Sequence, residues 1–191
     1  MQPQDAKDDL KAIREMMERV RRTSDGFGGW FMVLWGAIWF LGFTGTHILT
    51  GLQQEEAIKW LWILFDSLGA LGSIYLGIQM ARRARTKSFT LWAHVLLYWL
   101  ALAAFDGVLI WQFRLYTEGL RIVLLIVLTV ALGYIQFGIF THWSISLIGL
   151  GIGLLAIVLA MWLPDYFNLG FAVLGGGALI GGGLWALRYG G

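Results

Sequence analysis

Hydrophobic residues along the chain fall into six long stretches, which are separated by short polar breaks. We place these stretches at 27–51, 58–81, 89–113, 119–141, 143–163 and 168–188. Each is at least as long as the roughly 20 residues that a helix needs to cross about 30 Å of hydrocarbon. Apolar and polar positions do not alternate within them, as the strands of a membrane barrel require. The pattern therefore predicts an all-α integral membrane protein, a bundle of six transmembrane helices.

A different pattern occupies the first 26 residues, which are polar and charged with a periodic apolar stripe. Apolar residues recur there at spacings of three and four, as on one face of an amphipathic helix. They are Leu10, Ile13, Met16, Met17 and Val20. Such a stripe binds a membrane surface or a partner helix. We therefore divide the chain into an amphipathic N-terminal segment, 1–26, and a six-helix transmembrane domain, 27–191.

The charges of the predicted loops indicate the orientation of the bundle. Eleven Lys and Arg residues lie in the N-terminal segment, the second and fourth loops and the C-terminus, against three on the opposite side. Because basic residues are enriched in cytoplasmic loops, both termini are predicted to be cytoplasmic. Tryptophans are expected in belts at the two interfaces. Trp30, Trp92, Trp143 and Trp185 are assigned to the cytoplasmic belt, and Trp60, Trp62, Trp111 and Trp162 to the other.

Composition agrees with a membrane location and narrows the chemistry. Hydrophobic residues make up 58% of the chain and charged residues 14%, with a mean hydropathy of +0.69, a balance that a soluble domain of this size could not bury. The absence of cysteine excludes disulfides and thiolate chemistry. The loops account for the net charge of +2, so we expect no nucleic-acid partner. No metal-helix, nucleophile-elbow or phosphate-loop signature occurs, and we expect no enzymatic activity.

Small residues four apart predict places where helices pack closely, since small side chains let backbones approach in lipid. These lines are Gly69, Ser73 and Gly77 in the second stretch, Gly149 and Gly153 in the fifth, and Gly177 and Gly181 in the sixth. The packing partner is either another helix of the same bundle or a second protomer. We therefore expect contact with the bilayer together with a protein partner or a homo-oligomer.

Two acidic residues within the apolar stretches are the leading candidates for chemistry. Asp66 and Asp106 both lie roughly 10–12 Å below the outer boundary at 1.5 Å per residue, and His47 is slightly shallower. Ionisable residues at membrane depth are costly and often functional. One interpretation is a proton or cation site formed by Asp66, Asp106 and His47 that opens outward. The other is a pair of neutral or hydrogen-bonded carboxyls that hold the second and third helices together.

The position of Asp66 relative to the small residues predicts its direction. Asp66 precedes Gly69 by three residues, so it shares the close-packed face and is expected to point into the bundle. We expect its carboxyl near His47, Thr44 or Asp106. No cofactor is predicted. His94 and His47 lie near opposite membrane faces and cannot ligate one haem together, which leaves open a site for a haem or pigment at one of them.

The stretch Leu10–Arg19, LKAIREMMER, is followed by Gly28, Gly29 and Trp30. It resembles the opening of a group of small bacterial polytopic membrane proteins of unknown function. In those proteins an Ile-Arg-x-Met-Met-Glu-Arg-like helix precedes a first span rich in Gly and Trp. Their Ser-rich turn is replaced here by Thr23–Gly26. The resemblance implies a bacterial inner membrane and names no activity.

Two functions fit these observations. The first is a non-enzymatic accessory subunit, scaffold or signalling element of a membrane complex, which acts through its N-terminal helix and its Gly-rich helix faces. The second is a small proton- or cation-linked transporter or channel that uses Asp66 and Asp106. The positions of the two carboxyls distinguish these functions.

Overall fold

The computed structural model describes residues 28–84, 89–115, 119–140 and 143–189, and within these ranges every element is helical. The first span is Gly28–Gly51. It is followed by α2 (Glu55–Ala84), α3 (Phe89–Gln112), α4 (Gly119–Phe140) and α5 (Trp143–Trp162). The last span consists of the 3-10 turn η2 (Pro164–Tyr166), α6 (Phe167–Gly170), the π-helix η3 (Phe171–Gly176) and α7 (Gly177–Tyr189). The amphipathic segment 1–26 lies outside these residues.

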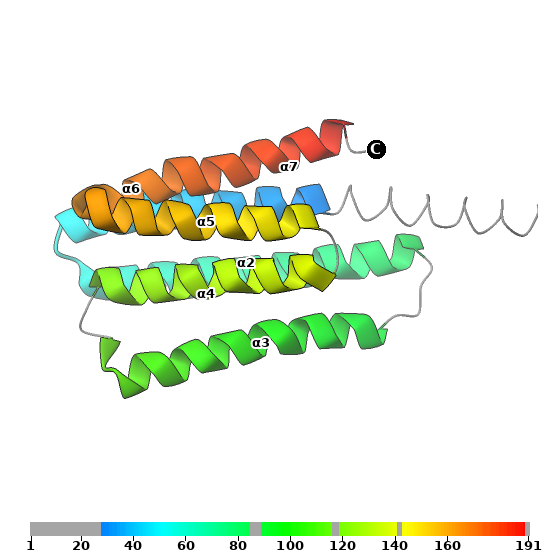
Figure 1. Ribbon diagram of the computed structural model, residues 1–191, viewed down its shortest axis with the longest axis horizontal. Helices are drawn as coiled ribbons and strands as arrows, with labels where there is room; N and C mark the ends of the chain where they lie inside the picture. Colours follow the sequence, from blue (N-terminus) through cyan, green and yellow to red (C-terminus); the bar gives the residue numbers. More distant parts are fainter. Residues whose placement is uncertain (1–27, 85–88, 116–118, 141–142, 190–191) are drawn as a thin grey trace, which may run out of the picture.

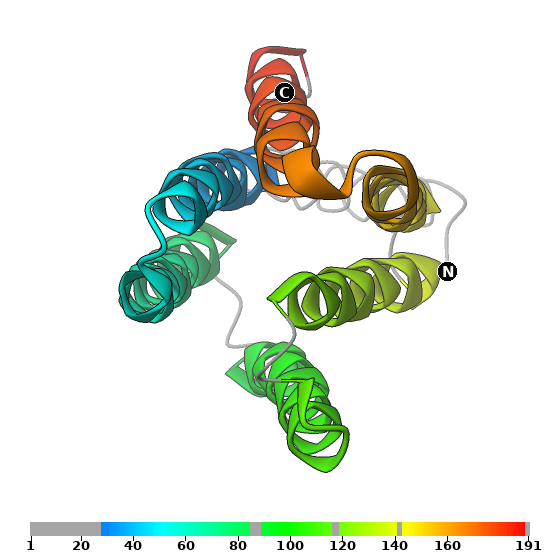
Figure 2. The same ribbon diagram turned by 90° about the vertical axis from the view of Figure 1, so that its left-hand side faces the viewer.

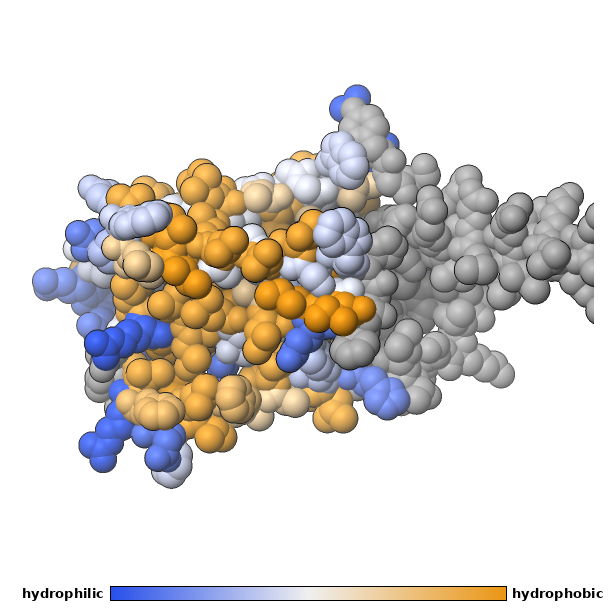
Figure 3. Space-filling model, in the orientation of Figure 1, coloured by the Kyte–Doolittle hydropathy of each residue, from blue (hydrophilic) through white to orange (hydrophobic). Residues whose placement is uncertain are grey.

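The helices run lengthwise beside one another (Figure 1). Five of the described helical segments are long and apolar enough to cross a membrane, and α3 adds a shorter apolar helix, Leu96–Gln112. Orange, hydrophobic side chains cover the middle of the molecule, and blue ones gather at the end where α2 begins (Figure 3). The prediction of a helical membrane bundle is therefore confirmed. The count of six crossings and the cytoplasmic position of the termini stay predictions.

Seen end-on, the helices form a curved row (Figure 2). α2 packs on the first span, which packs on the last span. The last span continues the row to α5, α5 to α4 and α4 to α3. α2 and α3 are consecutive in the sequence, but they stand at the two ends of the row and do not pack closely against each other. The row is therefore an open ring with its gap between α2 and α3.

The first and last spans touch backbone to backbone at glycines. A Cβ added to Gly176 would lie 2.7 Å from the Phe40 nitrogen and 2.9 Å from the Gly36 carbonyl oxygen. One at Gly183 would lie 2.6 Å from the Gly29 carbonyl oxygen. Real side-chain carbons do not approach this closely, so only glycine fits at these positions. The sequence thereby fixes which face of the last span meets the first.

α4 and α5 pack closely against each other as an antiparallel pair. A Cβ at Gly149 would lie 2.6 Å from the Ala131 carbonyl oxygen. Near the short connection between the two helices, the Ser146 hydroxyl donates to the Ile135 carbonyl oxygen at 2.8 Å. The pair is therefore held by close backbone approach along its length and by a hydrogen bond near the turn.

An aromatic cluster fills the space between the first and last spans. The rings of Phe167 and Phe171 are nearly parallel, with centroids 5.6 Å apart, and both side chains are fully buried. Phe43 meets Phe171 edge-on at 5.0 Å and Trp62 at 5.0 Å. The Trp62 Nε1 donates to the Thr46 hydroxyl at 2.9 Å. Trp62, which the sequence assigns to the outer aromatic belt, instead packs into this cluster because Thr46 satisfies its N–H.

The last span differs from the uninterrupted helix expected over 168–188. It begins at Pro164, whose missing N–H costs nothing in a first helical turn, and its middle, Phe171–Gly176, is a π-helix. A π-helical turn takes in an extra residue, which shifts the phase of the helix. Phe167 precedes the π-helix and Phe171 begins it, and both face the aromatic cluster. Gly176 ends the π-helix, and together with Gly183 it faces the first span.

Replacement of Gly149 by alanine is expected to destabilise the bundle by about 1–3 kcal/mol, because the new methyl meets backbone atoms that cannot move aside. Gly153→Ala is the matched control on the same helix, since its methyl would meet Ala131 Cβ at an ordinary 3.5 Å. The two variants should differ clearly in unfolding free energy in detergent micelles. Equal stability would show that α4 and α5 are further apart than described.

Candidate functional site

Asp106 lies in the interface between α3 and α4. The Thr129 hydroxyl on α4 donates to Asp106 Oδ1 at 2.7 Å. Both side chains are buried, with relative exposures of 8% for Asp106 and 9% for Thr129. An acid at membrane depth must find a polar partner or a proton. In this interface Thr129 supplies the hydrogen bond.

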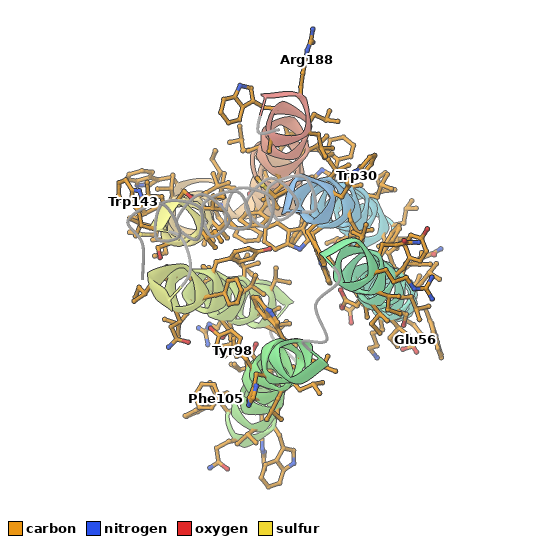
Figure 4. The ribbon with its side chains drawn as sticks, turned by 90° about the vertical axis from the view of Figure 1, so that its right-hand side faces the viewer. Trp30, Glu56, Tyr98, Phe105, Trp143 and Arg188 are labelled. Atoms are coloured by element: carbon orange, nitrogen blue, oxygen red, sulfur yellow. The ribbon has the colours of Figure 1, made fainter. Side chains whose placement is uncertain are left out.

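A second polar contact lies further along the same interface. The Tyr98 hydroxyl is 2.9 Å from the Gly133 carbonyl oxygen, to which it donates, and 2.9 Å from Gln136 Oε1. Figure 4 shows Tyr98 between α3 and α4, while Phe105 on the same helix points away from the ring. Together with Asp106 and Thr129 these side chains form a polar seam, and it attaches α3 to the bundle.

Asp66 has a different environment on α2. Its side chain is exposed, and no hydrogen bond or ion pair joins it to another described residue. The Trp35 Nε1 on the first span donates to the Ser73 hydroxyl of α2 at 3.1 Å. At about 100° per residue, Asp66 lies about 20° round α2 from Ser73 and about 60° from Gly69. Asp66 therefore lies on the Ser73 side of the face that packs on the first span.

This side of α2 faces the interior of the open ring. Trp35 lies only about 40° round the first span from Trp39, a buried core residue. The opposite flank of α2 contacts the outer side of the first span, where Gly72 meets Leu34. Asp66 thus lies on the flank of α2 beside the gap between α2 and α3, where its side chain is exposed.

The structure does not bring the three predicted site residues together. Asp106 is bonded to Thr129, and no hydrogen bond or charge interaction connects its carboxyl with that of Asp66. His47 is half-buried, and its ring lies 6.4 Å from that of Tyr166, at the end of the bundle where α2 begins. Asp66 contacts neither His47 nor Thr44 by a hydrogen bond. Within the described ranges, these three side chains therefore do not meet at one point where they could share a proton or a cation.

The histidines offer no obvious cofactor site within the described part of the chain. His94 on α3 is exposed, and His47 is far from it along the helices. No group of three His, Asp or Glu side chains in these ranges is arranged to hold a metal ion. A haem or pigment on a single histidine stays an open expectation.

The predicted small-residue lines have different surroundings. Gly69 and Gly77 are buried on α2, and a Cβ at Gly69 would lie 2.8 Å from the Trp35 ring. On α5 a Cβ at Gly153 would meet Ala131 at ordinary van der Waals distance, in contrast to Gly149. At Gly177 and Gly181 a Cβ would have no described atom within 4 Å. Packing at the last two positions stays a prediction about contact between protomers.

Sequence reasoning missed the residues of α4 that receive α3. Thr129, Gly133 and Gln136 are spaced four and three apart, so they form a small and polar line on one helix face. That spacing was a usable signal, because polar side chains in a membrane helix tend to hydrogen-bond across to another helix. Tyr98 carried a weaker signal, since tyrosine is also common at membrane interfaces.

The amphipathic stripe Leu10, Ile13, Met16, Met17 and Val20 lies outside the described residues. No protein-family model, curated protein or solved structure matches the chain. The resemblance carried by Leu10–Arg19 therefore stays an interpretation of the sequence. Any functional conclusion must come from the residues and their geometry.

Thr129→Val keeps the shape of the side chain but removes the donor to Asp106, and we expect it to lower the unfolding free energy by about 0.5–1.5 kcal/mol. Thr129→Ser retains the hydroxyl and should lose less. Combined with Asp106→Asn in a double-mutant cycle, measured by unfolding in micelles, the pair should show a non-zero coupling energy. Additive effects would mean that the seam does not depend on this hydrogen bond.

Proposed function

We propose that the chain is a non-enzymatic accessory subunit or scaffold of a membrane complex. The single observation that carries the proposal is the gap between α2 and α3. α2 packs closely against the first span and no other described helix, and only 11% of its most apolar window is buried. The faces of α2 and α3 on either side of the gap are therefore free to contact a neighbouring protein.

The environment of the gap favours a partner protein over a water-filled pathway. Beside Asp66 on the inward flank of α2 lie Ile63, Ala70 and Ile74, all exposed. A path for ions needs a succession of polar groups that replace water around the ion. Here one carboxyl is surrounded by apolar side chains, which suit a helix surface or lipid. The transporter reading with Asp66 and Asp106 therefore has less support.

The site of action we propose is the bacterial inner membrane, with both termini in the cytoplasm. The support is the excess of Lys and Arg on the side of the termini, eleven against three, because that asymmetry is typical of cytoplasmic loops. In this orientation the N-terminal stripe lies in the cytoplasm, next to the membrane surface. It gives the subunit a second surface for a partner, which is separate from the gap.

If the N-terminal stripe contacts a partner, the double variant Ile13→Glu, Met17→Glu should reduce the size of the complex extracted from native membranes with a mild detergent. The two glutamates cannot be buried against a partner, so the contact loses the free energy of burying two apolar side chains. The measurement is the mass of the tagged protein by native electrophoresis, compared with the 21.4 kDa chain. A wild-type protein that migrates alone under every extraction condition would contradict the proposed function.

The matched control places two substitutions on the opposite face of the same predicted helix. Glu15→Gln with Arg19→Gln removes one acidic and one basic residue, so the net charge stays unchanged. This variant should keep the complex of the wild-type protein. Loss of the complex in both variants would indicate that the helix is needed for folding or insertion, and the stripe would then have no specific role.

A further inference from the structure

Asp66 is the only charged residue between Lys59 and Arg82 on α2. It lies about 10 Å along the helix from Lys59 and about 24 Å from Arg82. These distances are too long for residues at either end of α2 to form a hydrogen bond or an ion pair with its carboxyl. Its carboxyl is exposed and has no hydrogen-bond partner among the described residues. Contact with lipid would leave a strongly polar group in hydrocarbon, at a cost of several kcal/mol. The carboxyl therefore needs either a proton or a polar partner from outside the described residues, and a basic partner would supply the second.

The surface across the gap, on α3, is apolar and made of small and medium side chains. Trp99 marks the inward flank of α3, since its ring meets that of Tyr134 on the core side of α4 at 5.7 Å. Ala103 and Gly107 lie about 40° and 80° round the helix from Trp99, on the side away from Tyr98 and Phe105, and both are exposed. The small residues leave room for a helix backbone to approach.

We infer that the gap between α2 and α3 binds a transmembrane helix of another protein, and that this helix carries one Lys or Arg at the depth of Asp66. This inference rests on the proposed function and specifies its partner. Charge complementarity identifies the occupant. A basic group would satisfy the carboxyl in a site from which water is excluded, and intramembrane charges usually occur in such pairs. The rest of the docking helix would be apolar, to match Ile63, Ala70 and Ala103.

A second copy of this chain does not meet the requirement. Its basic residues lie in the N-terminal segment or close to the ends of the helices, and none occupies a span at the depth of Asp66. Two symmetry-related Asp66 carboxyls would bring together like charges. The complementary group must therefore come from a different protein.

The test uses the full chain, purified and reconstituted in lipid vesicles, with model peptides as the probe. One peptide is an apolar Leu/Ala helix of about 20 residues with a single Lys about seven residues from its outer end. The matched control peptide has Leu at that position, and a third has the Lys two turns deeper. Energy transfer between a labelled chain and a labelled peptide measures binding. The first peptide should bind about tenfold more tightly than either control, and Asp66→Asn should abolish the difference.

Crosslinking locates the bound peptide, because the chain contains no cysteine and single cysteines can be placed at will. Ala70→Cys is on the flank of Asp66, whereas Leu68→Cys is about 160° away from it; both positions are exposed. A peptide cysteine should form a disulfide with Ala70→Cys and not with Leu68→Cys. Unchanged thermal stability of Asp66→Asn would separate loss of binding from loss of fold.

Three results would overturn the inference. The Lys and Leu peptides could bind equally or not at all, which would leave lipid as the occupant. The preference for Lys could persist in Asp66→Asn, or Ala70→Cys could crosslink two copies of the chain in the absence of peptide. If the native complex survives in Asp66→Asn while the peptides fail, the accessory role stands and its contact lies elsewhere. If the wild-type chain forms no native complex, the proposed function itself fails.

Discussion

Close backbone approach at glycines is the constraint on which the rest of this bundle depends. In lipid, apolar side chains gain little by moving from contact with acyl chains to contact with another helix, so association relies on packing and hydrogen bonds. Gly36, Gly176 and Gly183 let the first and last spans touch through their backbones, and Gly149 does the same for α4 and α5. These contacts fix the sequence of neighbours in the ring. The large rings of Phe167 and Phe171 then fill the space that remains.

The same constraint explains why the ring stays open. The packed face of α3 contributes no glycine, since Gly107 faces open space, and this helix is attached to α4 through hydrogen bonds of Asp106 and Tyr98. α2 places Gly69 and Gly72 under large side chains of the first span, and so it has one firm neighbour. Neither helix presents a close-packing line to the other. The gap is therefore a consequence of where the small residues lie.

The sequence was sufficient for the helical stretches, because they follow from local periodicity. It was insufficient for the neighbours of each helix. Gly177 and Gly181 have the same spacing as a packing line, yet in the described chain they face open space, since the π-helical turn before them changes which side of the helix meets the first span. Trp62 has the composition of a belt residue, and only the position of Thr46 on another helix draws it into the core. Such pairings depend on tertiary contacts that no single helix specifies.

Asp66 and Asp106 show how far residue type and depth can determine a role. Both are acids in apolar helices at a similar depth, but Asp106 lies in the interface between α3 and α4, whereas Asp66 lies on a flank of α2 beside the gap. Asp106 meets Thr129, which satisfies it, so its contribution is to hold α3 in place. Asp66 lies beside a gap and meets no such group among the described residues, which is why we propose that a partner helix offsets its desolvation cost. The roles of the two acids thus depend on which side chains lie on the helix opposite each of them, and residue type and depth alone do not distinguish an acid with a structural role from one proposed to bind a partner.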